Sequence, residues 1–200
     1  MNKIRITQSL LSSWEWTFKK ESGWDDFLST LHREKKPPTE AMLDGIRFEN
    51  VLNSVLNGEQ ITEDHEWFAP ITEMADELWG SQQQVTLFRD IEVDGQPILL
   101  HGVLDYLREG IIWDCKFSKR YGSNGVVNKY LSSPQCPLYL TLCPEVFKFI
   151  YIISDGKYVY REVYPREIMP PIEPTIKQFL NFCDKYDLRK TLEEKWSVRN

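Results

Sequence analysis

Hydrophobic residues recur at helical spacing through the first third of the chain. The first run follows Thr7, a residue type that caps helix N-termini, and a longer run follows Thr39 and stops at Gly58. Residues 62–78 carry a third run in which acids are frequent. This part of the chain is therefore expected to be helical.

From Gln84 the hydrophobic period shortens to about two residues, which is typical of strands. Residues 85–93, 98–107 and 111–117 predict three successive strands, because Asp94-Gly95 and Glu109-Gly110 are turn signals between them. The later pattern predicts a helix at 128–142, strands at 147–153 and 158–164, and a helix at 173–190. The order predicts an α/β fold in a single domain, in which helices flank a central mixed sheet made of a three-strand antiparallel meander plus later strands.

Composition narrows the class of protein. Of the 200 residues 42% are hydrophobic and 13% aromatic, which excludes a disordered chain. There is no apolar run of the roughly 18–20 residues needed to span a membrane, and the N-terminus has no apolar signal segment. We therefore expect a cytoplasmic protein with no membrane partner. The four cysteines match no metal-binding spacing and are expected to be free thiols: Cys115, Cys136, Cys143 and Cys183.

The hairpin around Glu109-Gly110 carries the candidate chemistry. A two-residue turn there would place Asp105 opposite Asp114, and the strand period would put Lys116 on the same face. Like charges directly opposite each other destabilise a sheet, but a divalent cation between them reverses the sign of the interaction. Hard carboxylate ligands suit Mg²⁺ or Mn²⁺. A solvated salt-bridge cluster is the alternative interpretation.

Four segments, taken in order, resemble the PD-(D/E)XK nuclease superfamily, in the branch of RecB-type and phage exonuclease-like domains. Asp105 is followed by Asp114-Cys115-Lys116, Gly45 precedes Glu49 by four residues, and Gln135 precedes Tyr139 by four. The resemblance covers roughly residues 40–165. It implies one nuclease-like domain over residues 1–200, with a restriction-endonuclease-like core at about 40–165 and helical additions at both ends.

The resemblance also implies individual roles. The catalytic set would be Glu49, Asp105, Asp114 and Lys116. The first three side chains and the backbone carbonyl of Cys115 would bind Mg²⁺ or Mn²⁺, and Lys116 would orient water or stabilise charge in the transition state. Histidine is common at position 49 in the RecB-type branch, so Glu49 favours the exonuclease-like variants. The four-cysteine set of some relatives is absent, so no iron–sulfur cluster is expected.

The charge distribution indicates where a nucleic acid would lie. The net charge of −6 argues by itself against a polyanionic partner, but residues 40–80 hold ten acids and one base. Residues 115–144 hold no acid at all. The residues expected to contact DNA are Lys119, Arg120 and Lys129 from this acid-free segment, together with Gln135 and Tyr139 from the family motif.

The expected activity is a Mg²⁺-dependent deoxyribonuclease, specifically an exonuclease acting in phage, recombination or repair DNA processing. DNA is the expected partner, and a homo-oligomer or an annealing protein would be compatible, since related phage exonucleases form rings. Two alternatives stay open: an inactive nucleic-acid-binding scaffold that retains the fold, and, ranked lower, a sequence-specific endonuclease. Trp14, Trp16 and Trp24 could stack on unpaired bases, although packing is the favoured interpretation for all three.

Overall fold

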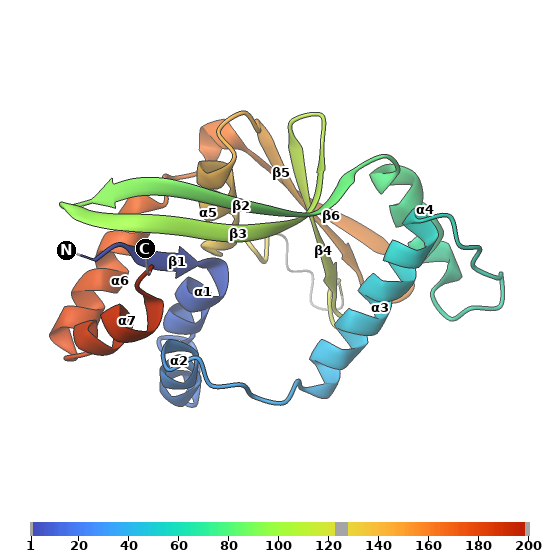
Figure 1. The fold of residues 1–200 in the computed structure, drawn as a ribbon. Coiled ribbons are helices and arrows are strands. Elements are labelled where there is room, and N and C mark those ends of the chain that lie inside the picture. Colours follow the sequence, from blue (N-terminus) through green and yellow to red (C-terminus); the bar gives the residue numbers. More distant parts are fainter. Residues whose placement is uncertain (1, 123–127, 199–200) are drawn as a thin grey trace.

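The computed structural model describes residues 2–122 and 128–198. Within them, helices cover a mixed six-stranded sheet (Figure 1). The strands are β1 (Ile4–Thr7), β2 (Gln82–Val93), β3 (Gln96–Arg108), β4 (Ile111–Phe117), β5 (Lys148–Ser154) and β6 (Val159–Pro165). The helices are α1 (Gln8–Trp16), α2 (Gly23–Leu31), α3 (Glu40–Leu56), α4 (Phe68–Leu78), α5 (Gln135–Leu142), α6 (Glu173–Lys185) and α7 (Arg189–Trp196), with a 3-10 turn at Arg166–Ile168. No helix in this part of the chain is long and apolar enough to cross a membrane.

The expected mixed α/β sheet is confirmed, including its antiparallel meander β2–β3–β4. The hairpin register is also as predicted, with Tyr106 opposite Trp113 and Arg108 opposite Ile111. From β4 the sheet continues through parallel β5 and antiparallel β6. The sheet also includes β1, which lies outside the expected core and was not predicted.

Strand β3 is the centre of this arrangement because three strands pair with it. Strand β2 occupies one edge, and the other edge is shared by β1, at residues 98–101, and β4, at residues 106–108. Between these two partners Asp105 has no ladder partner on either edge in the described pairing, and Gln84, which would face it on β2, has a positive φ of 50°. Irregular pairing of this kind re-aims side chains, and it is common beside active sites.

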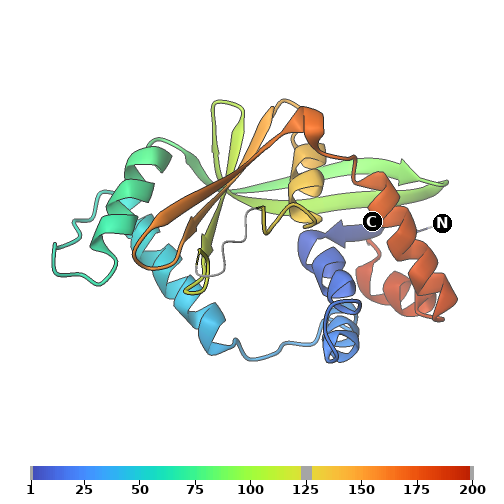
Figure 2. The same ribbon diagram turned by 180° about the vertical axis from the view of Figure 1, so that it is seen from behind.

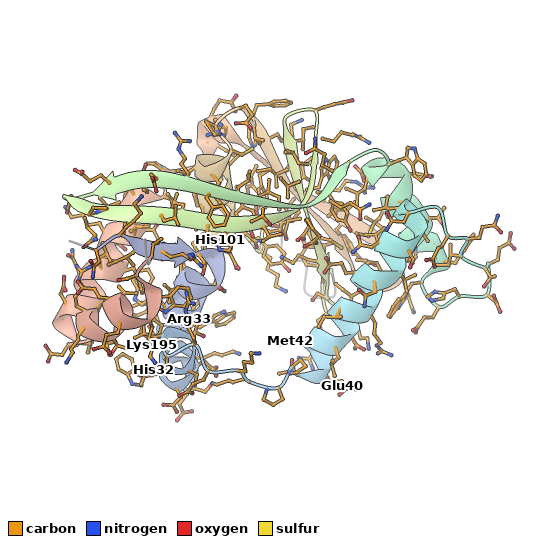
Figure 3. All side chains as sticks on the ribbon, in the orientation of Figure 1. His32, Arg33, Glu40, Met42, His101 and Lys195 are labelled. Carbon is orange, nitrogen blue, oxygen red and sulfur yellow. The ribbon has the colours of Figure 1, made fainter. Side chains whose placement is uncertain are left out.

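Two apolar clusters cover the two faces of the sheet. Alternate residues of β5 belong to different clusters: Tyr151 packs in the larger one with α1, α5 and α6, and Ile152 packs in the smaller one with α3 and α4. Figures 1 and 2 show α1 and α2 on one side of the end of β4 and α3 on the other, and residues 32–39 connect α2 to α3. The ends of that connection are marked in Figure 3 by Arg33 and Glu40.

Three expected helices have different boundaries. The helix expected at 62–78 begins only at Phe68, because His65 accepts a hydrogen bond from the Trp67 N–H in a preceding turn. The helix expected at 128–142 begins at Gln135, directly after Pro134. The helix expected at 173–190 divides in two at Asp187, whose φ is +56°. The expected caps are confirmed: Thr7 accepts from the Leu10 N–H and Thr39 from the Met42 N–H.

Gly102 lets helix α5 approach the sheet closely. A Cβ atom there would lie 2.7 Å from the Tyr139 ring and 2.8 Å from the Leu142 side chain. We therefore expect Gly102→Ala to lower the free energy of unfolding by about 1–3 kcal/mol, because the helix must move away. Gly45 in α3 has nothing within 4 Å, so Gly45→Ala should instead raise it by about 0.5–1 kcal/mol. Urea denaturation of both variants measures the contrast, and equal effects would contradict this account of Gly102.

Candidate active site

Two carboxyl groups meet at the irregular point of the sheet. Asp114 on β4 is only 1% exposed, and Asp105 on β3 accepts a hydrogen bond of 3.0 Å from the Cys115 N–H. The two carboxyl groups lie close enough for the charge of Asp114 to act on the pKa of Asp105. The Asp105 carboxylate thus takes a backbone donor at the point where the regular β3–β4 ladder has ended.

The proximity of these acids perturbs their titration. Burial, reinforced by the charge of Asp114 and opposed by Lys116, raises the pKa of Asp105 to about 8. Burial also raises the pKa of Asp114. Near neutral pH the pair therefore holds a proton that a bound cation would displace.

Lys116 supplies a positive charge beside the pair. Its ammonium forms an ion pair with Asp114, and its side chain is 30% exposed. Burial alone would lower the pKa of Lys116, but the carboxylates of Asp114 and Asp105 outweigh it and raise the pKa. Lys116 is therefore a permanent cation at neutral pH and cannot act there as a base.

Helix α3 brings Glu49 to the same place. Its half-buried carboxylate accepts a hydrogen bond of 3.2 Å from the Gln84 amide. Burial raises the pKa of Glu49, while the nearby Lys116 lowers it and Asp114 raises it. Gln84, where the backbone of β2 is irregular, thus binds an acid that comes from helix α3 and not from the sheet.

Helix α5 supplies the inner wall of the site. The Gln135 amide donates a hydrogen bond to Asp114 Oδ1, and both Gln135 and Tyr139 are buried. Burial raises the pKa of Tyr139, and the charges of Asp114 and Asp105 add to this effect. Gln135 and Tyr139 were expected to contact or position DNA. The structure brings them to the carboxylates, so positioning is the role that their contacts favour, and direct DNA contact stays a prediction.

The donor set fits a hard cation, although it is not a closed cage. In residues 2–122 and 128–198, no three His, Cys, Asp or Glu side chains lie close enough together to form a metal-binding group. Mg²⁺ is often held by one or two carboxylates plus substrate phosphates, so the pair Asp105 and Asp114 is compatible with it. Asp114 Oδ2 is buried without a hydrogen bond and is contacted only by the Lys116 ion pair. Glu49 and the Cys115 carbonyl stay predicted ligands.

Described residues of the acid-free segment, among them Lys119 and Lys129, form what we call the rim of the site. Lys119 lies 2.5 Å from Asp44, a buried acid on α3 that also pairs with Arg47. The hydrogen bonds from Lys119 and Arg47 hold the pKa of Asp44 below its usual value. An acid on a helix usually lies at the surface, but Asp44 is buried. The ion pair between Asp44 and Lys119 connects the acid-free segment to α3. These residues are 75 positions apart, and no periodicity in the sequence indicates that they pair.

A buried glutamate that the sequence analysis missed anchors the other end of the rim. Glu162 on β6 accepts hydrogen bonds from the Tyr121 and Tyr164 hydroxyls and from the N–H groups of Lys129 and Tyr130. Burial alone would raise the pKa of Glu162, but these hydrogen bonds lower it. The Lys129 ammonium lies over both flanking rings, 5.7 Å from Tyr121 and 5.6 Å from Tyr130. The alternating strand pattern around Glu162 could at most have indicated an inward-pointing acid.

Two cavities lie beside this rim and share Lys129. One, of about 660 Å³, is lined by residues of α3 and by Ser118, Lys119 and Arg120. The other, of about 510 Å³, is lined by α1 and by Lys116 and Gln135. The three expected DNA-contacting bases thus line one cavity, and Lys129 also lines the cavity that includes Lys116. His101, which adjoins Gly102, instead stacks on Phe88 on the sheet surface (Figure 3).

Comparison with known proteins bears on the fold. No family model matches the chain, and no curated protein matches it. Fourteen chains among the solved structures match, and one is described as the crystal structure of SSO0001. It is 16% identical, with a TM-score of 0.53 over 93% of this chain and 78% of that one. A likeness at this identity shows the mixed α/β fold alone.

Asp105→Asn is expected to stabilise the metal-free protein at alkaline pH. The pKa of Asp105 is raised in the folded state to about 8, against about 3.9 when unfolded, so the native state loses stability as pH rises between these values. An amide removes that loss and still accepts from the Cys115 N–H. Each kcal/mol gained should raise the melting temperature by about 2–4 °C at pH 9, and the gain should vanish near pH 4.

Thermal denaturation in EDTA measures this effect. Asp76→Asn, at an exposed position on α4, is the matched control and should show no pH-dependent gain. A lower melting temperature for Asp105→Asn at pH 9 would contradict the assigned repulsion.

Proposed function

We propose that the protein is a Mg²⁺-dependent deoxyribonuclease. The observation that carries this proposal is the convergence of the buried Asp114 and the partly buried Asp105 with the charged Lys116 on one hairpin. Burying like charges costs free energy, so the arrangement favours a function that uses them. The agreement of these positions with the PD-(D/E)XK motifs supports a nuclease over other hydrolases.

Each residue of the proposed site has its own role in hydrolysis. Asp105 and Asp114 hold the cation, with Glu49 beside them, and Gln135 keeps Asp114 in orientation. When bound, Mg²⁺ supplies Lewis-acid activation of the phosphoryl group and of water. The Lys116 ammonium stabilises the negative charge that develops on the phosphate and orients the attacking water. Lys129 and Arg120 bind the neighbouring phosphates.

An exonuclease is the mode we propose, since the motifs resemble those of phage-type exonucleases, which act in recombination and phage DNA processing. A sequence-specific endonuclease would need surfaces that read base edges. The linings of the two cavities include lysines, an arginine and serines, which suit contacts to the sugar–phosphate backbone.

Removing either charge of the hairpin should abolish cleavage. We expect Lys116→Ala and Asp114→Asn each to lower Mg²⁺-dependent hydrolysis of linear DNA by at least ~100-fold, because each removes a group that acts on the reacting phosphate or the cation. Lys190→Ala, an exposed lysine on α7, is the control and should match the wild type. End-labelled linear and circular DNA are compared with Mg²⁺ and with EDTA.

The substrates also distinguish the modes of cleavage. An exonuclease releases nucleotides from the linear ends and leaves the circle intact, whereas a sequence-specific endonuclease cuts the circle at discrete positions. Full activity in both hairpin variants would refute the assigned site.

A scaffold that binds nucleic acid without cleaving it is the second candidate. It is favoured by one observation: the described residues contain no group of three metal-ligating side chains. Calorimetric titration with Mn²⁺ separates the two candidates. Binding that Asp105→Asn abolishes supports the nuclease, and no binding at millimolar Mn²⁺ supports the scaffold.

Lys129 should carry a phosphate contact, because it lines both cavities. Lys129→Ala is expected to weaken DNA binding about equally for different sequences and to reduce the slope of log K against log salt by about 1. DNA affinity is measured by fluorescence anisotropy in EDTA at salt concentrations from about 25 to about 200 mM, a range that resolves such slopes. Lys190→Ala should leave the slope unchanged, and equal losses for both variants would contradict a local phosphate site.

A further inference from the structure

One tryptophan of α1 is held differently from its neighbours in the sequence. Trp14 is buried among the rings of Phe179 and Phe182, and Trp24 packs on Phe27 and other rings. Trp16 is 45% exposed, and it makes no ring–ring contact with any residue that the structure describes. Packing therefore accounts for two of the three tryptophans and leaves Trp16 unexplained.

Trp16 lies on the wall of the cavity that reaches the candidate active site. The lining of this 510 Å³ cavity combines residues of α1 and Lys19 with Lys116 of β4 and Gln135 of α5. Gln135 contacts Asp114 directly. The fold thus places an exposed indole and the candidate catalytic lysine on the same concave surface, although they are a hundred residues apart in sequence.

The charges around this indole favour an anionic aromatic ligand. The ammonium groups of Lys20 and Lys19 lie 4.8 and 5.9 Å from the centre of the Trp16 ring. Lys116 and Lys129 are further bases of the cavity lining, whose only acid, Glu15, is ion-paired with Lys19 at 3.3 Å. A partly exposed indole surrounded by lysines matches a nucleotide, which joins a flat base to a phosphate.

The concave surface continues past Trp16. A second cavity of about 350 Å³ shares Glu15, Lys19 and Ser132 with the first, and its wall includes Phe18, which is 67% exposed. A chain of several nucleotides would therefore have room to extend from Lys116 across α1.

We propose that Trp16 is a stacking platform for an unpaired base, and that the substrate bound at this site is single-stranded DNA or the unpaired end of a strand. This inference rests on the proposed nuclease function for the position of the cleaved phosphate at Lys116. Base stacking on an exposed aromatic ring tolerates any sequence, since every base has a π-face. Bases within a duplex are already stacked on each other, so the platform discriminates in favour of unpaired strands.

The direct test measures binding without cleavage. The full chain in EDTA is titrated against a fluorescein-labelled oligothymidine of about 12 nucleotides, a length comparable to one single-strand binding site. Trp16→Ala should weaken binding by about 5- to 150-fold, and Trp16→Phe, which keeps an aromatic face, should restore most of it. Binding to a blunt duplex should be nearly unaffected. Trp79→Ala, which removes a 60% exposed tryptophan outside both cavities, is the matched control and should bind as the wild type does.

Two results would overturn the platform. One is unchanged single-strand affinity in Trp16→Ala, and the other is an equal loss for single strand and duplex. The Trp16→Phe variant separates lost stacking from lost folding, because a misfolded site would not be restored by a smaller ring.

A Mg²⁺ cleavage assay on the same proteins separates this inference from the nuclease proposal. If the wild type does not cleave but Trp16→Ala still weakens single-strand binding, the platform stands and the nuclease proposal fails. If the wild type cleaves and Trp16→Ala binds and cleaves single strands normally, the nuclease stands and the platform is refuted.

Discussion

The arrangement of this protein depends on keeping two carboxyl groups, Asp105 and Asp114, next to each other inside an apolar sheet. Three polar groups around the pair offset the free-energy cost of this repulsion. The Cys115 N–H donates to Asp105, the Gln135 amide donates to Asp114, and the Lys116 ammonium pairs with Asp114. Cys115 and Lys116 lie on β4, and Gln135 is the first residue of α5. Both elements must therefore be in place for the two carboxyl groups to have all three partners.

The irregular pairing of the sheet and the close approach of α5 both shape the surroundings of Asp105. Asp105 lies where β3 has no ladder partner, and Gln84 opposite it turns its amide to Glu49. Gly102, three residues before Asp105, leaves room for Tyr139. The sheet thus lacks regular pairing over a short stretch, where Asp105 accepts from the Cys115 N–H and Gln84 donates to Glu49.

The net negative charge of the chain is compatible with the proposed DNA-binding site because acids next to the basic residues are engaged by specific partners. Asp44 on α3 pairs with Lys119, and Glu162 on β6 accepts from the N–H groups of Lys129 and Tyr130. Acids elsewhere are engaged locally, as where Arg161 binds Glu73 and Glu77. The lysines that line the cavities therefore act in a local field that the total charge does not describe.

Sequence alone determined the parts of this protein that depend on local periodicity. The meander, its register and the caps at Thr7 and Thr39 followed from the strand period, turn residues and capping chemistry, all of which act within a few residues. Helix boundaries were wrong where the backbone breaks a run of helical periodicity, as at Pro134 and at Asp187 with its positive φ.

Only the tertiary structure decided which distant residues share the site. Sequence patterns identified Asp105, Asp114 and Lys116 on one hairpin, because a two-residue turn fixes their register. They could not show that Asp44 and Glu162 are buried anchors, nor that Trp16 alone among three neighbouring tryptophans faces the cavity of Lys116. The physical reason is that burial and contact are properties of packed elements: a side chain's own periodicity fixes its face on a helix, but only the fold fixes what that face meets.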